Sequence, residues 1–197
     1  MLFRSPEIPD LSKTVPVRPP GFCTGCPERP IFAAMKLVEA ELGAHQITGD
    51  IGCHLFAALP PFEIGGSTMG YGLGAAIGAQ VASPKKRVVH VTGDGSFRMN
   101  LNEMATTARY NLPVITVLLD NHTLGMVRQW QTLFFDKRHA ETTLPALNFC
   151  AIAEGFGYFA QQVSDAAGFD AALQKALEHG GPSLIHCLID TEIGRAS

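Results

Sequence analysis

The sequence contains no long apolar run and no concentration of charge of one sign. No stretch approaches the roughly 20 apolar residues of a transmembrane helix, and the N-terminus lacks the apolar segment of a signal peptide. The formal net charge is −3 and the densest basic run is residues 85–87, which argues against nucleic acid or an anionic membrane as a partner. We therefore expect a cytoplasmic protein that acts on small molecules.

The length and composition favour one domain. With 197 residues, 46% of them hydrophobic, the chain can bury one substantial core. Prolines gather in residues 6–22 and deny helix and sheet their hydrogen bonds, so residues 1–22 are expected to form an arm or linker before an α/β domain over residues 23–192. Residues 1–5 and 193–197 resemble translated sequencing adapters, so we expect artefactual ends on a fragment of a larger protein.

Helical and strand-like patterns alternate along the chain. Helices are expected from residue 28 to the stop at 43 and at residues 75–82, 96–110, 145–154 and 165–178; strands are expected at residues 46–48, 88–91, 114–119, near 158 and at 183–190. The strands are nearly continuous apolar runs, and no hairpin signal joins them. This pattern predicts an α/β fold, a doubly wound parallel sheet covered on both faces.

Two neighbouring strands of the expected sheet end in polar residues. Asp94, between two glycines, follows one strand, and Asn121 follows the next. Carboxyl ends of parallel strands meet at one edge, and Ser96 opens a helix whose N–H groups suit a phosphate. Carboxylate, amide and carbonyl oxygens around a phosphate predict a Mg²⁺-diphosphate site. The alternative is that Asp94 caps a helix and Asn121 forms a turn.

A glycine-rich segment offers a rival phosphate site. Residues 70, 72 and 74 are glycines in a spacing loosely similar to a dinucleotide-binding fingerprint. No apolar strand leads into residues 65–66, and the spacing does not match the fingerprint, so NAD binding is disfavoured.

Residues 93–121 resemble the signature of thiamine diphosphate enzymes, in which a Gly-Asp-Gly triplet precedes an Asn by a little under thirty residues. The resemblance implies that Asp94, Asn121 and the main-chain carbonyl of Thr123 bind Mg²⁺. Asp120 departs from the family's Asn-Asn pair but leaves the ligand position in place. The resemblance also implies a thiamine diphosphate-binding (PP-type) domain, whose further cofactor-binding residues would be Gly52, Cys53, His54, Ser67, Thr68, Met69, Gly93, Gly95, Ser96, Gly125 and Met126.

Finer resemblances point to two families. Residues 93–106, 110–114 and 124–131 resemble the C-terminal domain of acetolactate synthase, in which Met126 would support the central ring region of the cofactor. Residues 18–32, 49–56 and 59–62 instead resemble the α subunit of indolepyruvate:ferredoxin oxidoreductase. The cysteines decide for the oxidoreductase, because they have no role in acetolactate synthase.

The cysteines Cys23, Cys26 and Cys53 match a pattern that, in the wider 2-oxoacid:ferredoxin oxidoreductases, supplies three thiolates to a [4Fe–4S] cluster. A cluster needs four ligands, and Cys150 and Cys187 are expected to pack in apolar surroundings. Two alternatives stay open. One is a zinc site completed by His54, and the other is simple packing or cofactor contact by Cys53 and His54.

The resemblance to the oxidoreductase implies oxidative decarboxylation of an aryl 2-oxoacid such as indolepyruvate. Electrons would pass through iron–sulfur clusters to ferredoxin, and the acyl group would pass to coenzyme A, all through parts of the parent complex outside this chain. The activating glutamate would come from a separate pyrimidine-binding domain, with a second subunit as partner, so the chain alone should be inactive. The alternatives are an acetolactate synthase-like carboligase or decarboxylase and a non-catalytic binding module.

Five other side chains have less specific interpretations. Trp130 and the pair Phe134 and Phe135 fit either an aryl-substrate pocket or ordinary hydrophobic cover. His90 and His186 lie in expected strands and are predicted to be core residues rather than acids or bases.

Overall fold

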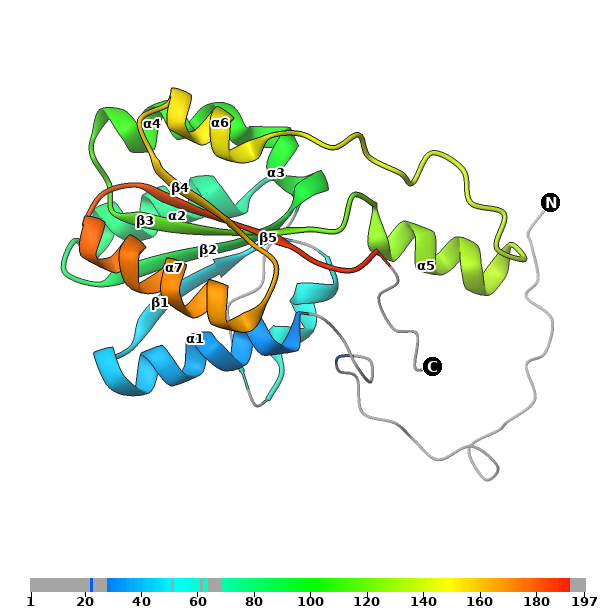
Figure 1. Cartoon of the computed structure of the whole chain (residues 1–197), viewed down its shortest axis with the longest axis horizontal. Coiled ribbons are helices and arrows are strands. Elements are labelled where there is room, and N and C mark those ends of the chain that lie inside the picture. Colours follow the sequence, from blue (N-terminus) through cyan, green and yellow to red (C-terminus); the bar gives the residue numbers. More distant parts are fainter. Residues whose placement is uncertain (1–21, 23–27, 51, 61, 64–68, 192–197) are drawn as a thin grey trace, which may run out of the picture.

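A computed structural model of the chain describes residues 22, 28–50, 52–60, 62–63 and 69–191, which contain one five-stranded parallel sheet (Figure 1). The strands are β1 (His45–Gly49), β2 (Arg87–Gly93), β3 (Val114–Asp120), β4 (Phe159–Val163) and β5 (Ser183–Leu188). Their order across the sheet is β1-β2-β3-β5-β4, and every pairing is parallel. The predicted α/β fold with a parallel sheet is confirmed.

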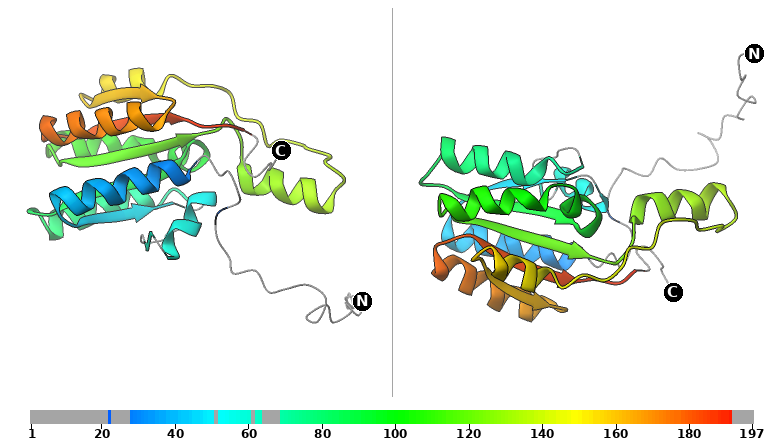
Figure 2. Two further views of the ribbon diagram at one scale, coloured as in Figure 1. Left: turned by 60° about the horizontal axis from the view of Figure 1, so that its bottom comes forward. Right: turned by 90° about the horizontal axis from the view of Figure 1, so that it is seen from above.

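Helices cover both faces of the sheet (Figure 2). One face is covered by α2 (Gly72–Ala82), α3 (Asp94–Asn100), α4 (Met104–Arg109) and α6 (Phe149–Gly155), and the other by α1 (Arg29–Leu42) and α7 (Ala166–His179). The chain moves across the sheet in one direction from β1 to β3 and steps back from β4 to β5. Because crossover connections are right-handed, this reversal places α7 on the opposite face from α2 and α4.

The core divides along the central strand β3, which is buried at all seven positions. Val117 and Leu119 pack with α1 and α7, whereas Leu118 packs with Phe97 of α3 and Phe149 of α6. A strand covered on both faces needs apolar side chains at consecutive positions, which explains the continuous run seen in the sequence.

The helix expected at residues 96–110 is divided. It begins at Asp94, and a short 3-10 turn, η2 (Leu101–Glu103), separates α3 from α4. At Asn100 the backbone leaves helical values (φ −144°, ψ 24°), and its side-chain Nδ2 donates to the carbonyl oxygen of Gly70 at 3.2 Å. This contact with the glycine-rich segment lies at the interruption between α3 and α4. The spacing of apolar residues in the sequence gives no sign of it. Among the other helices, α2 begins at residue 72 rather than 75, and α6 at residue 149 rather than 145.

Helix α5 (Gly125–Phe134) was not expected from the sequence and extends away from the layers of the fold (Figures 1 and 2). None of its described residues is buried, and Trp130 and Phe134 are 60% and 72% exposed. Phe135, just beyond it, is also exposed. In the described structure these three aromatic residues therefore do not cover the core, and their place in an aryl-substrate pocket stays a prediction.

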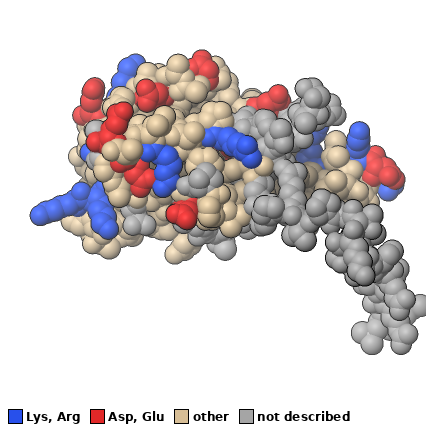
Figure 3. Space-filling model, turned by 90° about the horizontal axis from the view of Figure 1, so that it is seen from below, with Lys and Arg blue, Asp and Glu red and all other residues tan. Residues whose placement is uncertain are grey.

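Two further features are the distribution of charge on the surface and the apolar character of the helices. On the face drawn in Figure 3, Lys and Arg lie among Asp and Glu rather than in one patch. Among the helices of the described residues, none has the length and apolar character needed to cross a membrane.

Several predictions lie outside the described residues. They concern the end segments 1–5 and 193–197, nearly all of the arm over residues 1–22, and the pair Cys23 and Cys26. Only Phe22 of the arm is described; it is buried, and its ring stacks on Phe32 of α1 with ring centroids 5.5 Å apart. The proposed domain boundaries stay predictions.

Candidate functional site

A pocket, here called the edge pocket, lies at the carboxyl edge of the sheet where β2 and β3 end. Most of the predicted cofactor and metal residues line it: Gly52, Met69, Gly93, Asp94, Gly95, Ser96, Asn121, Thr123, Gly125 and Met126. Leu119, Leu124, Val127, Ile189 and Glu28 complete the lining. The fold thus brings together side chains that are far apart in the sequence, at the edge where parallel α/β sheets bind ligands.

The remaining predicted residues cannot be placed as fully. The backbone of Cys53 and His54 begins the 3-10 helix η1 (Cys53–Ala58), next to pocket-lining Gly52. Ser67 and Thr68 lie outside the described residues. The proposed roles of these four residues stay predictions.

Glycine at position 95 permits close packing at the floor of the edge pocket. A Cβ there would lie 2.8 Å from Cδ2 of Leu124 and 3.4 Å from Cδ1 of Leu144. The side chains that follow β3 can therefore approach the first turn of α3 only because residue 95 has no side chain.

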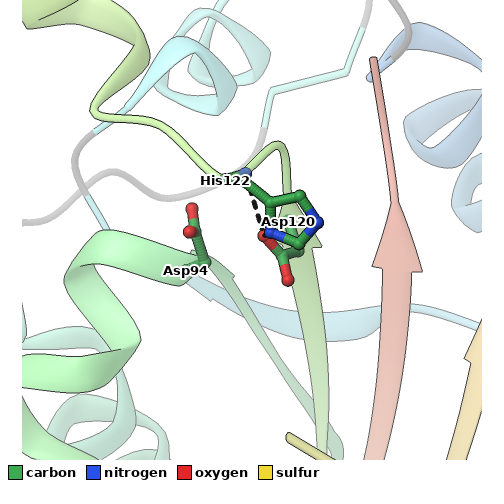
Figure 4. Close-up of side chains that lie close together, drawn as sticks. All are labelled: Asp94, Asp120 and His122. Carbon is green, nitrogen blue, oxygen red and sulfur yellow. Dashed lines mark hydrogen bonds and ion pairs between the residues drawn. The ribbon is translucent and has the colours of Figure 1, made fainter. Parts of the chain in front are cut away.

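Asp94 in the first turn of α3 lies beside Asp120, the last residue of β3, and His122 (Figure 4). One potential ligand atom from each of these three side chains lies within 4.8 Å of the others. Asp94 and Asp120 are buried, so two carboxylates share a site that is largely shielded from water.

The surroundings of Asp94 fit a cation. Burial, and next the negative charge of Asp120, raise its pKa to about 7, although Arg98 lies 3.6 Å from its Oδ2. That oxygen is buried without a hydrogen-bond partner among the described residues. A divalent cation would satisfy this oxygen and offset the repulsion between the two carboxylates.

Asn121 and Thr123 form a compact turn after β3. Oδ1 of Asn121 accepts a hydrogen bond from the backbone N–H of Thr123 at 3.1 Å, so the turn anticipated as the alternative role of this residue is present. The hydroxyl of Thr123 donates to the carbonyl oxygen of Thr142 at 2.7 Å. The side chain of Thr123 is thus used within the fold, and the role of its main-chain carbonyl in binding a cation stays a prediction.

Asp120 was not singled out as a site residue by the sequence. Its Oδ2 lies 2.8 Å from Nε2 of His186 on the adjacent strand β5, and its Oδ1 accepts from the backbone N–H of His122 at 3.0 Å. Burial alone would raise the pKa of Asp120, but the contacts with His186 and His122 outweigh it and the pKa is lowered. Asp120 is therefore an ionised neighbour of Asp94. Its position next to Asn121 was the only sequence signal for it.

Asp50, just after β1, is a second buried carboxylate that sequence reasoning missed. Its Oδ1 accepts from the backbone N–H of Gly72 at 2.7 Å, and its Oδ2 accepts from the hydroxyl of Thr92 at 2.6 Å and lies 3.1 Å from Nε2 of His90. Burial alone would raise the pKa of Asp50, but these contacts outweigh it and the pKa is lowered. The network fixes the start of α2 against β1 and β2.

The histidines and cysteines expected in the core are found there. His90 and His186 are buried, and each lies within hydrogen-bonding distance of an aspartate. Cys187 packs in the cluster between the sheet and α1 and α7, and Cys150 lies against the cluster on the opposite face. Burial raises the pKa of both thiols, to about 12 for Cys187. Both thiols therefore lie in apolar surroundings, on opposite faces of the sheet.

A parallel α/β domain with carboxylate and amide oxygens at the ends of adjacent strands has the layout of a domain that binds a phosphate-bearing ligand through a cation. Residues 50–187 match the family described as thiamine pyrophosphate enzyme, C-terminal TPP binding domain. The chain belongs to this family. Thiamine pyrophosphate is the same compound as thiamine diphosphate.

Acetolactate synthase large subunits are among the relatives of the chain. The chain is 45% identical over 158 residues to the acetolactate synthase isozyme 2 large subunit of Escherichia coli (strain K12), covering 78% of this chain and 28% of the relative. It is 46% identical over 124 residues to the acetolactate synthase large subunit of Porphyra purpurea, covering 62% and 21%. The chain thus spans less than a third of the length of either relative.

A solved structure has a similar fold. It is the thiamine diphosphate-dependent 4-hydroxybenzoylformate decarboxylase of Rhodococcus jostii RHA1, with a TM-score of 0.69 and 25% identity, covering 89% of this chain and 34% of that chain.

These findings correct the functional expectation. The prediction of an indolepyruvate:ferredoxin oxidoreductase is wrong, because relatives that are 45% and 46% identical to the chain are acetolactate synthase large subunits. An iron–sulfur cluster is likewise not supported. The prediction rested on Cys23, Cys26 and Cys53, and the similarity to acetolactate synthases outweighs three thiols without a fourth described ligand.

Proposed function

We propose that the intact protein is a thiamine diphosphate-dependent carboligase of the acetolactate synthase type, which joins two 2-oxoacid molecules with loss of carbon dioxide. The observation that carries the cofactor part is the buried Oδ2 of Asp94, which has no hydrogen-bond partner among the described residues and lies beside Asn121 at the carboxyl edge of the sheet. The similarity to acetolactate synthase large subunits supports the carboligase part.

Each part of the edge pocket has a distinct role in this proposal. Asp94, Asn121 and the main-chain carbonyl of Thr123 would hold Mg²⁺, and the glycines and Ser96 around the first turn of α3 would hold the diphosphate. Met69 and Met126 supply polarisable apolar surface for the rings. When bound, thiamine diphosphate supplies the electron sink that decarboxylation of a 2-oxoacid requires.

The protein's own contribution is position and electrostatics. Asp120, held by His186 and the backbone of His122, keeps a second negative charge beside Asp94, which strengthens the attraction for a divalent cation. The Asp50 network holds the glycine-rich segment against β1 and β2. The glutamate that activates the aminopyrimidine is proposed to come from a pyrimidine-binding domain elsewhere in the intact protein or its partner subunit.

The test combines binding with product analysis. The intact protein should bind thiamine diphosphate in a Mg²⁺-dependent manner by calorimetry and should convert pyruvate to acetolactate. Carbon dioxide release without acetolactate would show a decarboxylase instead. Absence of any cofactor binding would refute the proposal as a whole.

A further inference from the structure

Glu28, which precedes α1, is a buried carboxyl group in the edge pocket that has no role in the proposed cation site. Its side chain is only 3% exposed, and it lines the pocket together with Asp94 and Met126. Its Oε2 is fully buried and has no hydrogen-bond partner among the described residues.

Local structure does not explain why a carboxyl group is buried there. Glu28 is the N-cap residue of α1 but makes no side-chain capping hydrogen bond. The neighbouring Arg29 does not compensate it, since its guanidinium donates to the carbonyl oxygen of Phe22 at 2.9 Å. A buried polar atom without a partner is costly, so it is either a defect or a group kept for a ligand.

The surroundings keep a proton on Glu28. Burial raises its pKa to about 8, and no charge contributes to that shift. Charged side chains on the elements around the pocket include Asp94 and Arg98 on α3, Asp120 at the end of β3, Arg128 on α5, Asp190 after β5 and Arg29 on α1 itself. None of them acts as a counter-ion that would stabilise an ionised Glu28. At neutral pH the group is a neutral hydrogen-bond donor.

We propose that Glu28 is a ligand-binding residue of the edge pocket, which in its protonated form donates a hydrogen bond to an anionic oxygen of the bound ligand. The inference rests on the proposed function, in which the ligand oxygen belongs either to the diphosphate of the cofactor or to the carboxylate of the 2-oxoacid. An ionised Glu28 would repel the same oxygen, so binding requires the proton. No proton is transferred in this role.

The test measures two constants between pH 6.5 and 9 in the intact protein: the Kd of thiamine diphosphate at saturating Mg²⁺, and the KM for pyruvate. In the wild type, one of them should rise about tenfold between pH 7 and 9, as Glu28 loses its proton. In Glu28→Gln the amide still donates but cannot ionise, so that rise should disappear. Glu178→Gln, on the exposed surface of α7, is the matched control and should behave as the wild type.

The two constants show which ligand carries the oxygen that Glu28 binds. A rise in Kd assigns it to the cofactor, and a rise in KM alone assigns it to the substrate. The inference is overturned if both constants follow the same pH dependence in the wild type and in Glu28→Gln.

A measurement on the ligand-free protein is independent of turnover. Infrared difference spectra between the wild type and Glu28→Gln should show a protonated carboxyl band at pH 7 that is lost above pH 8. Absence of that band at pH 7 would also overturn the inference. Failure of the proposed function looks different, since the wild type and Glu178→Gln would then bind no thiamine diphosphate at any pH.

Discussion

The carboxylate of Asp50 accepts a hydrogen bond of 2.7 Å from the backbone N–H of Gly72, which joins the end of β1 to the first residue of α2. The second carboxylate oxygen binds Thr92 and lies 3.1 Å from His90, both on β2. Two strands and a helix start are thus held by one buried side chain. This leaves no room for a side chain at residue 72.

Gly72→Ala should destabilise the fold. Its Cβ would lie 2.6 Å from Nε2 of His90 and 3.0 Å from Cγ of Asp50, so the network must shift. We expect a loss of about 2 kcal/mol in the free energy of unfolding, measured with urea. The matched control is Gly74→Ala in the same helix, where no heavy atom of the described residues lies within 4 Å of the added Cβ. It should be neutral or up to about 1 kcal/mol more stable. Equal effects of the two variants would contradict the role assigned to Asp50.

Asp94→Asn should weaken Mg²⁺-dependent binding of thiamine diphosphate. Asparagine keeps the size of the side chain but removes its negative charge. Loss of a direct ligand should lower the affinity at least as much as the roughly 10- to 100-fold seen for residues that only orient metal ligands. Calorimetry with and without Mg²⁺ measures the effect. Asp170→Asn, on the exposed surface of α7, is the control. Unchanged affinity in Asp94→Asn would remove Asp94 from the cation site.

Asp120→Asn should move the pH dependence of cation binding. The pKa of Asp94 is about 7 because of burial and, next, the charge of Asp120, so protons compete with the cation as the pH falls through 7. Removing the Asp120 charge should lower that pKa, and binding should then persist to lower pH than in the wild type. The measurement is the Mg²⁺ requirement for cofactor binding between pH 5.5 and 8. If the pH midpoint of Mg²⁺-dependent binding is the same in the variant and the wild type, the two carboxylates do not interact.

Glu28→Gln should change how stability depends on pH. The pKa of Glu28 is about 8 in the folded protein, against 4.5 for an exposed glutamate. Between these values the folded state holds a proton that the unfolded state has lost, so the wild type loses stability as the pH rises from 4.5 to 8. Glutamine cannot ionise, so the variant does not lose stability in this way. The free energy of unfolding of the variant, relative to that of the wild type, should therefore rise by on the order of 3 kcal/mol between pH 5 and 8. Parallel stability curves from urea unfolding would mean that Glu28 is ionised in the folded protein.

The sequence was sufficient for the sheet and for the Asp94–Asn121 pair, because both depend on local signals. Apolar runs define the buried strands, and polar residues that directly follow such runs must lie at the carboxyl edge. Asp50 and Glu28 were missed because their environments are set by residues distant along the chain: Gly72, Thr92 and His90 for Asp50, and the edge pocket for Glu28.

Helix α5 and the function were missed for different reasons. No residue of α5 is fully buried, and Trp130, Leu133 and Phe134 are exposed, so burial gives no reason to expect a helix packed on the described core. The function was misassigned because three cysteines were given more weight than the sequence around Asp94 and Met126. Cysteine spacing specifies a cluster only when a fourth ligand is in place.

The most direct test is the product formed from pyruvate by the intact protein loaded with thiamine diphosphate and Mg²⁺. Acetolactate formation that depends on both cofactors and is lost in Asp94→Asn is the predicted result. Cofactor-loaded protein that consumes pyruvate without forming acetolactate would contradict the proposed carboligase function.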